Sequence, residues 1–207
     1  MTRILYLHGF ASGPSSTKAR YFRDLLERAG ARVDVPDLAA GDFENLTITG
    51  QLKLIETLAA GEPVAMMGSS MGGYLSALYA ARHPEVTRLV LLAPGFCFAR
   101  RWPEYLGPEK MDEWRRTGYL EFFHYAENRP RRLSYRMIED AGRYEDFPDF
   151  QQPALIFHGA QDDVVPASRS EEFAAAHPNV QLEVLESGHD LLNMQDYMAP
   201  KVVRFLL

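Results

Sequence analysis

The sequence lacks the features that would place it in a disulfide scaffold, a membrane or a nucleic-acid complex. Cys97 is the only cysteine, so no internal disulfide can form and no oxidising compartment is required. No apolar run approaches the roughly 20 residues of a membrane span, and the first residues lack the apolar stretch and cleavage site of a signal peptide. Acidic side chains outnumber basic ones by 28 to 22, which argues against a nucleic-acid partner. We therefore expect a cytoplasmic protein without a membrane span.

Signatures of bound metals and cofactors are missing as well. The sequence has no H-E-x-x-H motif and no cysteine pair, and its six histidines are scattered. It also lacks the G-x-G-x-x-G and G-K-[ST] patterns of nucleotide-binding proteins. We expect no metal and no cofactor, and a small-molecule substrate as the partner. The oligomeric state stays open.

The sequence does contain short apolar runs that alternate with segments of helical periodicity. The predicted strands cover residues 4–7, 32–35, 63–67, 88–93, 154–158 and 181–185. The predicted helices cover residues 17–29, 46–60, 71–82, 168–176 and 196–207, the first with Ser16 as its N-cap. This alternation indicates βαβ units with right-handed crossovers. It predicts one α/β domain over residues 1–207, with an about six-stranded, mostly parallel sheet and helices on both faces.

Residues 96–150 interrupt the alternation. They hold 13 of the 24 Phe, Trp and Tyr residues, although they make up about a quarter of the chain. A connection of this length usually carries its own helices or a function. We predict a small helical cap inserted at about 96–150, with helices at 109–116 and 133–141. Its aromatic side chains either hold the cap on the sheet or line a substrate pocket.

Some residues of this segment are candidate substrate contacts. We expect Phe96, Phe98 and Trp102 to contact the substrate, together with Phe10 from an earlier loop. Four arginines could bind an anionic end of a substrate, although pairing at the surface is the favoured interpretation: Arg100, Arg101, Arg131 and Arg132.

Residues 68–72 form the pattern G-x-S-x-G between a predicted strand and a predicted helix. A strand that turns directly into a helix holds its turning residue in a strained conformation and projects the side chain above the sheet. The spacing selects Ser70 as a nucleophile. The alternative, a glycine-rich helix entry that binds phosphate, is less favoured because the nucleotide-binding patterns are missing.

Two backbone amides are expected to form an oxyanion hole. The Met71 N–H lies at the start of the helix that follows Ser70, where the helix favours negative charge. The second donor is predicted to be the Phe10 N–H, in the loop after the first strand. His8 in the same loop is expected to bond the backbone and to take no part in catalysis.

A serine nucleophile needs a base, and the base needs a carboxylate. His189 follows the last predicted strand, and Gly188 is expected to let its loop fold over the sheet edge. Asp162 and Asp163 both follow the strand at 154–158; Asp162 is favoured by its position, and Asp163 is expected to cap the loop or the helix at 168. The chain order Ser70, Asp162, His189 is typical of α/β-hydrolases.

At these residues the chain resembles the α/β-hydrolase superfamily. The matching segments are Leu7-His8-Gly9-Phe10, the motif at 68–73, residues 158–166 and Ser187-Gly188-His189. The segment at 12–19 is similar to that of small bacterial esterases, and residues 68–73 and 162–166 are similar to the palmitoyl-thioesterase branch. The resemblance implies the reduced form of the α/β-hydrolase fold, without the first antiparallel strands.

The expected activity is that of a serine hydrolase that cleaves carboxylic esters through a Ser-His-Asp triad and an acyl-enzyme. The alternative is an acyl-thioesterase acting on acyl-protein or acyl-CoA substrates, because both reactions use the same chemistry. A non-catalytic relative that only binds a ligand is less favoured, since it would not need all three side chains. A peptidase or lyase on the same scaffold is a third alternative.

Overall fold

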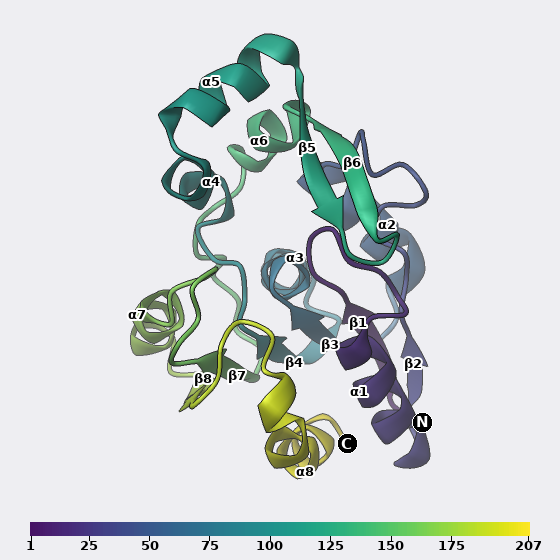
Figure 1. The fold of residues 1–207 in the computed structure, drawn as a ribbon. Helices are drawn as coiled ribbons and strands as arrows, with labels where there is room; N and C mark the ends of the chain where they lie inside the picture. The colour runs from purple at the N-terminus through teal and green to yellow at the C-terminus, as the bar shows by residue number, and fades with distance from the viewer.

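The chain folds into an α/β structure, and the computed structural model describes all of residues 1–207 (Figure 1). The main sheet contains β1 (Arg3–Leu7), β2 (Arg32–Asp34), β3 (Val64–Ser69), β4 (Val86–Leu92), β7 (Ala154–Gly159) and β8 (Val180–Leu185). The helices outside residues 96–150 are α1 (Thr17–Arg28), α2 (Ile48–Ala59), α3 (Met71–Ala80), α7 (Ser168–Ala176) and α8 (Gln195–Leu206), and a 3₁₀ turn, η1, covers Leu192–Met194. We call residues 96–150 the cap segment; it contains α4 (Phe98–Leu106), α5 (Pro108–Thr117), β5 (Tyr119–His124), β6 (Arg129–Ser134) and α6 (Arg136–Ala141).

The main sheet is six-stranded and parallel, in the order β2-β1-β3-β4-β7-β8. The predicted α/β fold class is therefore confirmed. The chain passes from β1 to β2 on one side and then to β3 on the other side of β1, so the direction of the connections reverses between β1 and β3. Leu7 at the end of β1 pairs with Gly68 near the end of β3, so the loops after these strands leave the sheet side by side. Open α/β sheets bind their ligands at such a reversal point.

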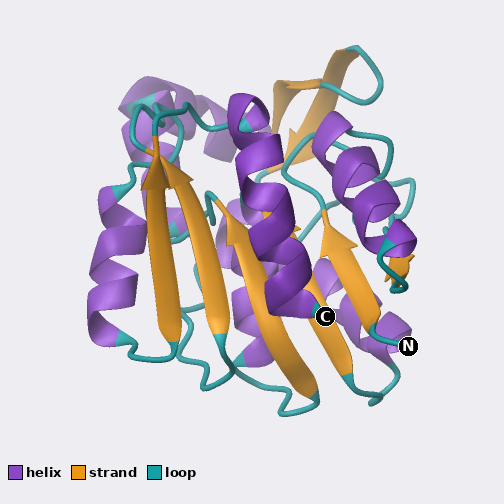
Figure 2. Ribbon diagram, turned by 90° about the horizontal axis from the view of Figure 1, so that it is seen from below, coloured by secondary structure: helices purple, strands orange, loops and turns teal.

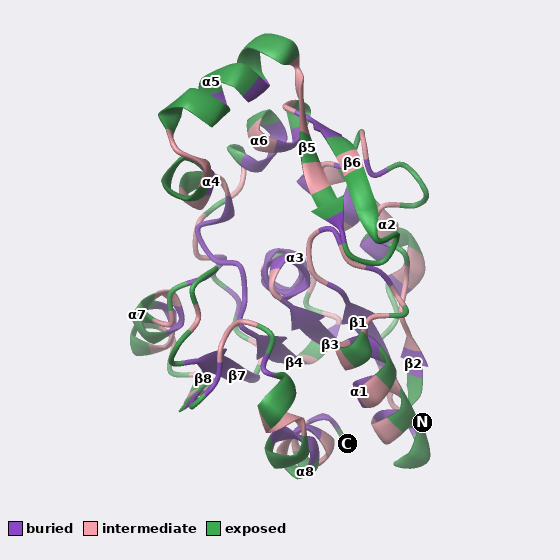
Figure 3. Ribbon diagram, viewed as in Figure 1, coloured by how far each residue is buried: buried purple, intermediate pink, exposed green.

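Side chains that alternate along the inner strands enter two separate cores. In β1, Leu5 and Leu7 face a core shared with α2, α3, α7 and the cap segment, whereas Ile4 and Tyr6 face a core shared with α1 and α8. Figure 2 shows α1 and α8 crossing one face of the sheet. Figure 3 shows the central strands buried and much of α5 and β6 exposed. Because both faces are covered, substrates can reach the sheet only at an edge.

The cap segment contains three helices and an antiparallel hairpin, β5–β6 (Figure 1). The predicted helix at 109–116 corresponds to α5. The predicted helix at 133–141 is wrong in its first part, because Leu133 and Ser134 end β6 and α6 begins only at Arg136. The hairpin was not predicted. A turn residue with a left-handed backbone, Asn128 at φ 51°, separates its two strands, which was the available signal.

The cap segment is fixed to the loop that follows β1. The Tyr125 N–H donates to the Ala11 carbonyl at 2.8 Å, at the tip of the hairpin. Inside the segment, the Trp114 Nε1–H donates to the Leu133 carbonyl at 2.9 Å, and the Trp102 and Trp114 ring centroids lie 5.5 Å apart. The aromatic side chains thus build the interior of the cap segment.

Outside the cap segment, each predicted element matches an observed one to within about two residues at either end. Ser16 is the N-cap of α1, and its hydroxyl accepts from the Ala19 N–H at 3.4 Å. None of the helices has the length and apolar character needed to cross a membrane.

Candidate active site

Ser70 occupies the turn between β3 and α3 in a strained conformation, with φ 53° and ψ −117°. Its carbonyl accepts from the Gly95 N–H at 2.8 Å, which helps to hold this conformation. A Cβ added at Gly68 would collide with the Gly72 backbone, and one added at Gly72 would collide with the Leu7 backbone. The glycines of the G-x-S-x-G pattern are therefore required because strand and helix approach each other so closely.

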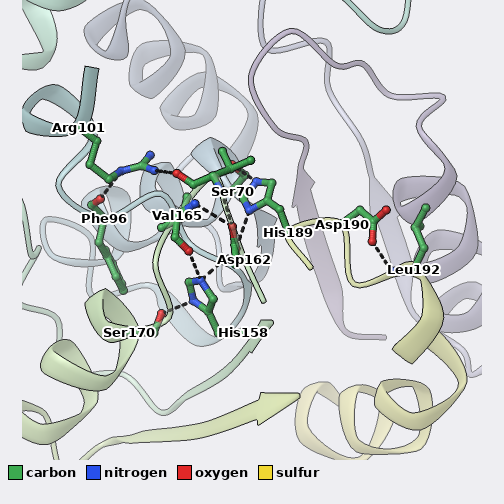
Figure 4. A network of polar contacts seen from close by, with 11 residues as sticks. Ser70, Phe96, Arg101, His158, Asp162, Val165, Ser170, His189, Asp190 and Leu192 are labelled. Atoms are coloured by element: carbon green, nitrogen blue, oxygen red, sulfur yellow. Dashed lines mark hydrogen bonds and ion pairs between the residues drawn. The ribbon is translucent and has the colours of Figure 1, made fainter. Parts of the chain in front are cut away.

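Three of the predicted site residues form one hydrogen-bonded chain (Figure 4). His189 Nε2 lies 3.0 Å from Ser70 Oγ, and His189 Nδ1 lies 2.7 Å from Asp162 Oδ2. The three residues follow β3, β7 and β8, whose carboxyl ends meet at one edge of the parallel sheet. With the proton on Nδ1, the imidazole donates to Asp162 and can accept the proton of the Ser70 hydroxyl.

The Asp162 side chain is fully buried and is surrounded by donors. Its Oδ1 accepts from the Val164 N–H at 2.9 Å and from the Val165 N–H at 2.8 Å. Burial alone would raise the pKa of this carboxyl, but the hydrogen bonds from His158 and His189, the attraction of His189 and the Val165 N–H lower the pKa well below its ordinary value. Asp162 therefore remains a carboxylate.

Asp163 does not have the capping role that was expected for it. Asp162 closes the loop itself through its bonds to the Val164 and Val165 amides, while Asp163 is exposed. Helix α7 begins after Ala167 and has no side-chain cap. The same carboxylate thus holds the loop and the imidazole, because its two oxygens point in different directions.

His158 is a neighbour of Asp162 that was not predicted from the sequence. Its side chain is fully buried, and Nε2 lies 3.1 Å from Asp162 Oδ2 and 2.8 Å from the Val165 carbonyl. Its Nδ1 lies 2.7 Å from the Ser170 hydroxyl, at the start of α7. The four-residue spacing between His158 and Asp162, directly after a strand, was the signal that could have indicated the contact.

The two residues whose amides are expected to bind an oxyanion, Phe10 and Met71, line the same cavity as Ser70. The loop after β1 runs close to the serine, since a Cβ added at Gly9 would lie 3.5 Å from Ser70 Cβ. Met71 is the first residue of α3, so its N–H has no acceptor within the helix. The Phe10 N–H forms no hydrogen bond within the chain. Both donors are thus available to an anion beside Ser70.

His8 bonds the backbone, as predicted. Its Nε2 accepts from the Leu38 N–H at 3.1 Å, so Nδ1 carries the proton and donates to the Gly9 carbonyl at 2.9 Å. Burial lowers the pKa of His8 and so favours this neutral form. His8 thereby fixes the loop that carries the Phe10 amide.

A cavity of about 570 Å³ opens beside Ser70 and His189. This volume suits a small-molecule ligand. Phe10, Phe98 and Trp102 line it and remain candidate substrate contacts. Further apolar and aromatic side chains of its lining, most of them from the cap segment, are Tyr105, Phe122, Phe123, Tyr125, Val164 and Leu192.

Phe96 lies outside this cavity, which corrects its prediction as a substrate contact. Its side chain is fully buried. The ring packs against Phe173 of α7 at 4.4 Å between centroids and against Phe147 at 5.6 Å. The position after β4 directs Phe96 into the core between the cap segment and α7 instead of toward Ser70.

The cap arginines differ in their surroundings. Arg100 pairs with Asp146 at 2.7 Å, Arg131 pairs with Glu127, and the Arg132 guanidinium lies 4.1 Å from the centre of the Tyr119 ring. Arg101 has no carboxylate partner and lines the cavity. No three His, Cys, Asp or Glu side chains are grouped so that they could hold a metal ion.

The sheet order, the strained serine turn and the position of the cap segment define an α/β-hydrolase fold, and solved structures confirm the predicted resemblance at the level of the fold. The structure resembles mouse alpha/beta hydrolase domain-containing protein 10 (TM-score 0.80, 20% identity, 97% of this chain and 87% of that chain). It also resembles Est1E from Butyrivibrio proteoclasticus (TM-score 0.74, 20% identity, 99% and 86%). The chain belongs to the family UPF0227, described as an uncharacterised protein family, which it matches over residues 3–206.

The sequence is also similar to curated hydrolases. Human monoacylglycerol lipase ABHD6 is 25% identical over 249 aligned positions, which cover 97% of this chain and 73% of the human protein. The mouse protein of the same name is 26% identical with nearly the same coverage. These likenesses support a hydrolase of the lipase or esterase type.

Proposed function

We propose that this protein hydrolyses carboxylic esters through a covalent acyl-enzyme. The observation that carries the proposal is the chain from Ser70 Oγ to His189 Nε2 (3.0 Å) and from His189 Nδ1 to Asp162 (2.7 Å), beside an aromatic cavity. Serine is a weak nucleophile unless a base removes its proton. In this arrangement His189 is the base, and Asp162 is the carboxylate that orients it.

In the first step, His189 Nε2 takes the Ser70 hydroxyl proton as Oγ attacks the ester carbonyl. The carbonyl oxygen becomes an oxyanion, which the Phe10 and Met71 N–H groups bind. When the tetrahedral intermediate collapses, the bond to the alkoxy group breaks and His189 gives its proton to the leaving alcohol. Water then attacks the acyl-Ser70 ester with His189 again as the base, and the acid is released with Ser70 restored.

The substrate is proposed to carry an apolar group that lies against the cap segment. Each CH₂ buried there contributes about 0.8 kcal/mol, so kcat/KM for 4-nitrophenyl esters should rise with the first few carbons of the acyl chain. A profile that stays flat or falls beyond acetate would contradict an apolar subsite. Assaying the matching acyl thioesters in parallel separates an esterase from a thioesterase.

Ser70→Ala should lower kcat at least 10³-fold for every ester, because the residual rate then depends on the amides and on binding alone. It should also abolish covalent labelling by a fluorophosphonate. Ser15→Ala is the matched control, since Ser15 is exposed and does not line the cavity. Full activity in Ser70→Ala would refute the nucleophile, whereas a wild type that takes no label and cleaves no ester would point to a ligand-binding protein.

A further inference from the structure

The charged side chains around the cavity do not match the acidic character of the protein. Apart from His189, the lining contains Lys18, Arg101 and Asp190, so these three sum to one positive charge. The whole chain has a net charge of −6. The Asp162 carboxylate also acts here, but it is buried, bonded to His189 and to two amides, and does not line the cavity. Hydrolysis of a purely apolar ester needs no cation in the lining.

Lys18 has no partner. This second residue of α1 is partly buried and forms no hydrogen bond or ion pair with any other side chain or carbonyl. Lys201, by contrast, donates to Glu183 at 2.6 Å, and Lys53 is exposed to solvent. A cation in the first turn of a helix is also opposed by the helix dipole. The fold therefore holds a cation without a hydrogen-bonded or ion-paired partner at an unfavourable position.

Burial acts on Lys18 but leaves it charged at neutral pH. Burial lowers the pKa of its ammonium group to about 8, while the attraction of Asp190 and Asp162 opposes the shift. Asp190 lines the cavity too, yet its Oδ1 accepts from the Leu192 N–H at 3.1 Å instead of bonding Lys18.

A second group in the same lining lacks a partner. The Tyr6 hydroxyl is buried and forms no hydrogen bond. Buried hydroxyls are rarely left unpaired unless a ligand or water completes them. Ser16 and Thr17 precede Lys18 and also line the cavity, so α1 contributes a polar wall that contrasts with the aromatic side chains of the cap segment.

Arg101 has a different position. Its Nε donates to the Phe96 carbonyl at 3.1 Å, and Nη1 donates to the Val164 carbonyl at 2.6 Å. These bonds fasten α4 of the cap segment to the loop that holds Asp162. In Figure 4, Ser70 and His189 lie in the middle, with Arg101 on one side of them and Asp190 on the other side. Arg101 adds positive charge, and these bonds use two of its five N–H donors.

We propose that Lys18 binds a carboxylate of the substrate, so that the preferred esters carry one negative charge at the end of the cavity opposite their apolar group. This inference rests on the proposed ester hydrolysis at Ser70. The single ammonium group of Lys18 suits a monoanion, and Tyr6, Ser16 and Thr17, which line the same cavity, carry hydroxyls that can donate to it. Lys18 is a specificity-determining residue that the reaction itself does not require.

The test compares esters that differ by one carboxylate. On the acyl side the pair is 4-nitrophenyl hydrogen glutarate and 4-nitrophenyl pentanoate. On the leaving-group side the pair is 4-carboxyphenyl butanoate and 4-carbamoylphenyl butanoate. Wild type should prefer the charged member of at least one pair. Lys18→Met should lower kcat/KM for that member about 10- to 100-fold, the effect of losing one charge-assisted hydrogen bond, and leave the neutral member within about twofold.

Two further variants make the result specific. Lys18→Arg should keep the preference for the carboxylate, and it serves as the test should Lys18→Met fail to fold. Lys53→Met removes the same charge from the exposed surface of α2 and should change neither member. Equal losses on charged and neutral esters in Lys18→Met, or a wild type without preference in either pair, would overturn the proposal while ester hydrolysis stands.

Binding without turnover separates this inference from the proposed reaction. In the Ser70→Ala background, monomethyl adipate should bind more tightly than dimethyl adipate by isothermal titration calorimetry, and adding Lys18→Met should remove the difference. If wild type cleaves no ester but the difference in binding is present, the hydrolase proposal fails and the carboxylate site remains. If adding Lys18→Met to Ser70→Ala changes the affinity for neither adipate ester, the carboxylate site fails.

Discussion

At the scale of single residues, Asp162 has the most constrained environment in the molecule. Its carboxylate is buried, bonds two amides through one oxygen, and meets His158 and His189 through the other. A buried charge is tolerated only when it is paired and hydrogen-bonded on all sides. His158, at the end of β7, is one of those partners, and no such role was predicted for it from the sequence.

Asp162→Asn should lower kcat on the order of 10⁴-fold, because an amide nitrogen facing His189 Nδ1 favours the tautomer that cannot accept the Ser70 proton. Asp163→Asn should stay within about twofold, since Asp163 is exposed and outside the chain of bonds. Both substitutions remove one negative charge. A difference between their kcat values, measured by steady-state kinetics on one ester, therefore reflects the position of the carboxylate. The reverse order of effects would exchange the roles of the two aspartates.

At the scale of elements, the site depends on how closely the connecting loops approach each other. The sequence predicts that Gly188 lets the His189 loop fold over the sheet edge, but a Cβ added there would have only one neighbour, the Gln161 carbonyl at 3.9 Å. A Cβ added at Gly159, the last residue of β7, would collide with the backbone of Ser187 and Gly188. Gly159 is therefore the position that lets the His189 loop lie against the sheet.

Gly159→Ala should displace the His189 loop and lower kcat/KM on the order of 10²-fold, because a shift of about 1 Å in a catalytic group has that effect. Gly188→Ala should remain within a few-fold of wild type. Both variants should keep the circular dichroism spectrum of wild type. Similar activity in the two would show that the loop tolerates the added methyl group at either position.

The hairpin β5–β6 of the cap segment could not be predicted from the periodicity of its residues. The aromatic and charged residues at 119–134 carry no clear helical spacing, and the hairpin they form is stabilised by contacts from other parts of the chain. Ser134 N–H donates to the Glu44 carbonyl at 2.8 Å, and the Phe122 ring packs 5.5 Å from Phe10. Pairing with distant residues, which local propensity does not include, decides this structure.

At the scale of the whole molecule, the ionisation of Asp162 links the site to stability. Its pKa is lowered in the folded protein, so it stabilises the fold above the ordinary carboxyl pKa near 4 and loses this contribution as pH falls. Between pH 6 and pH 3, the free energy of unfolding of wild type should fall by about 1 kcal/mol more than that of Asp162→Asn. Urea denaturation at both pH values measures this difference, and equal decreases would show that Asp162 is not held ionised in the fold.

The order of strands and helices, the nucleophile turn and the chain order of the three site residues could be predicted from the sequence alone. Buried parallel strands are apolar runs, helices that cover them are amphipathic, and a strand that turns directly into a helix requires glycines at fixed spacing, so each leaves a local pattern. The position of Phe96 outside the cavity, the hairpin of the cap segment, the contact of His158 with Asp162 and the unpaired Lys18 became visible only in three dimensions. These features depend on contacts between residues that are far apart in the sequence. Packing of the whole chain determines those contacts, and no short stretch of residues encodes them.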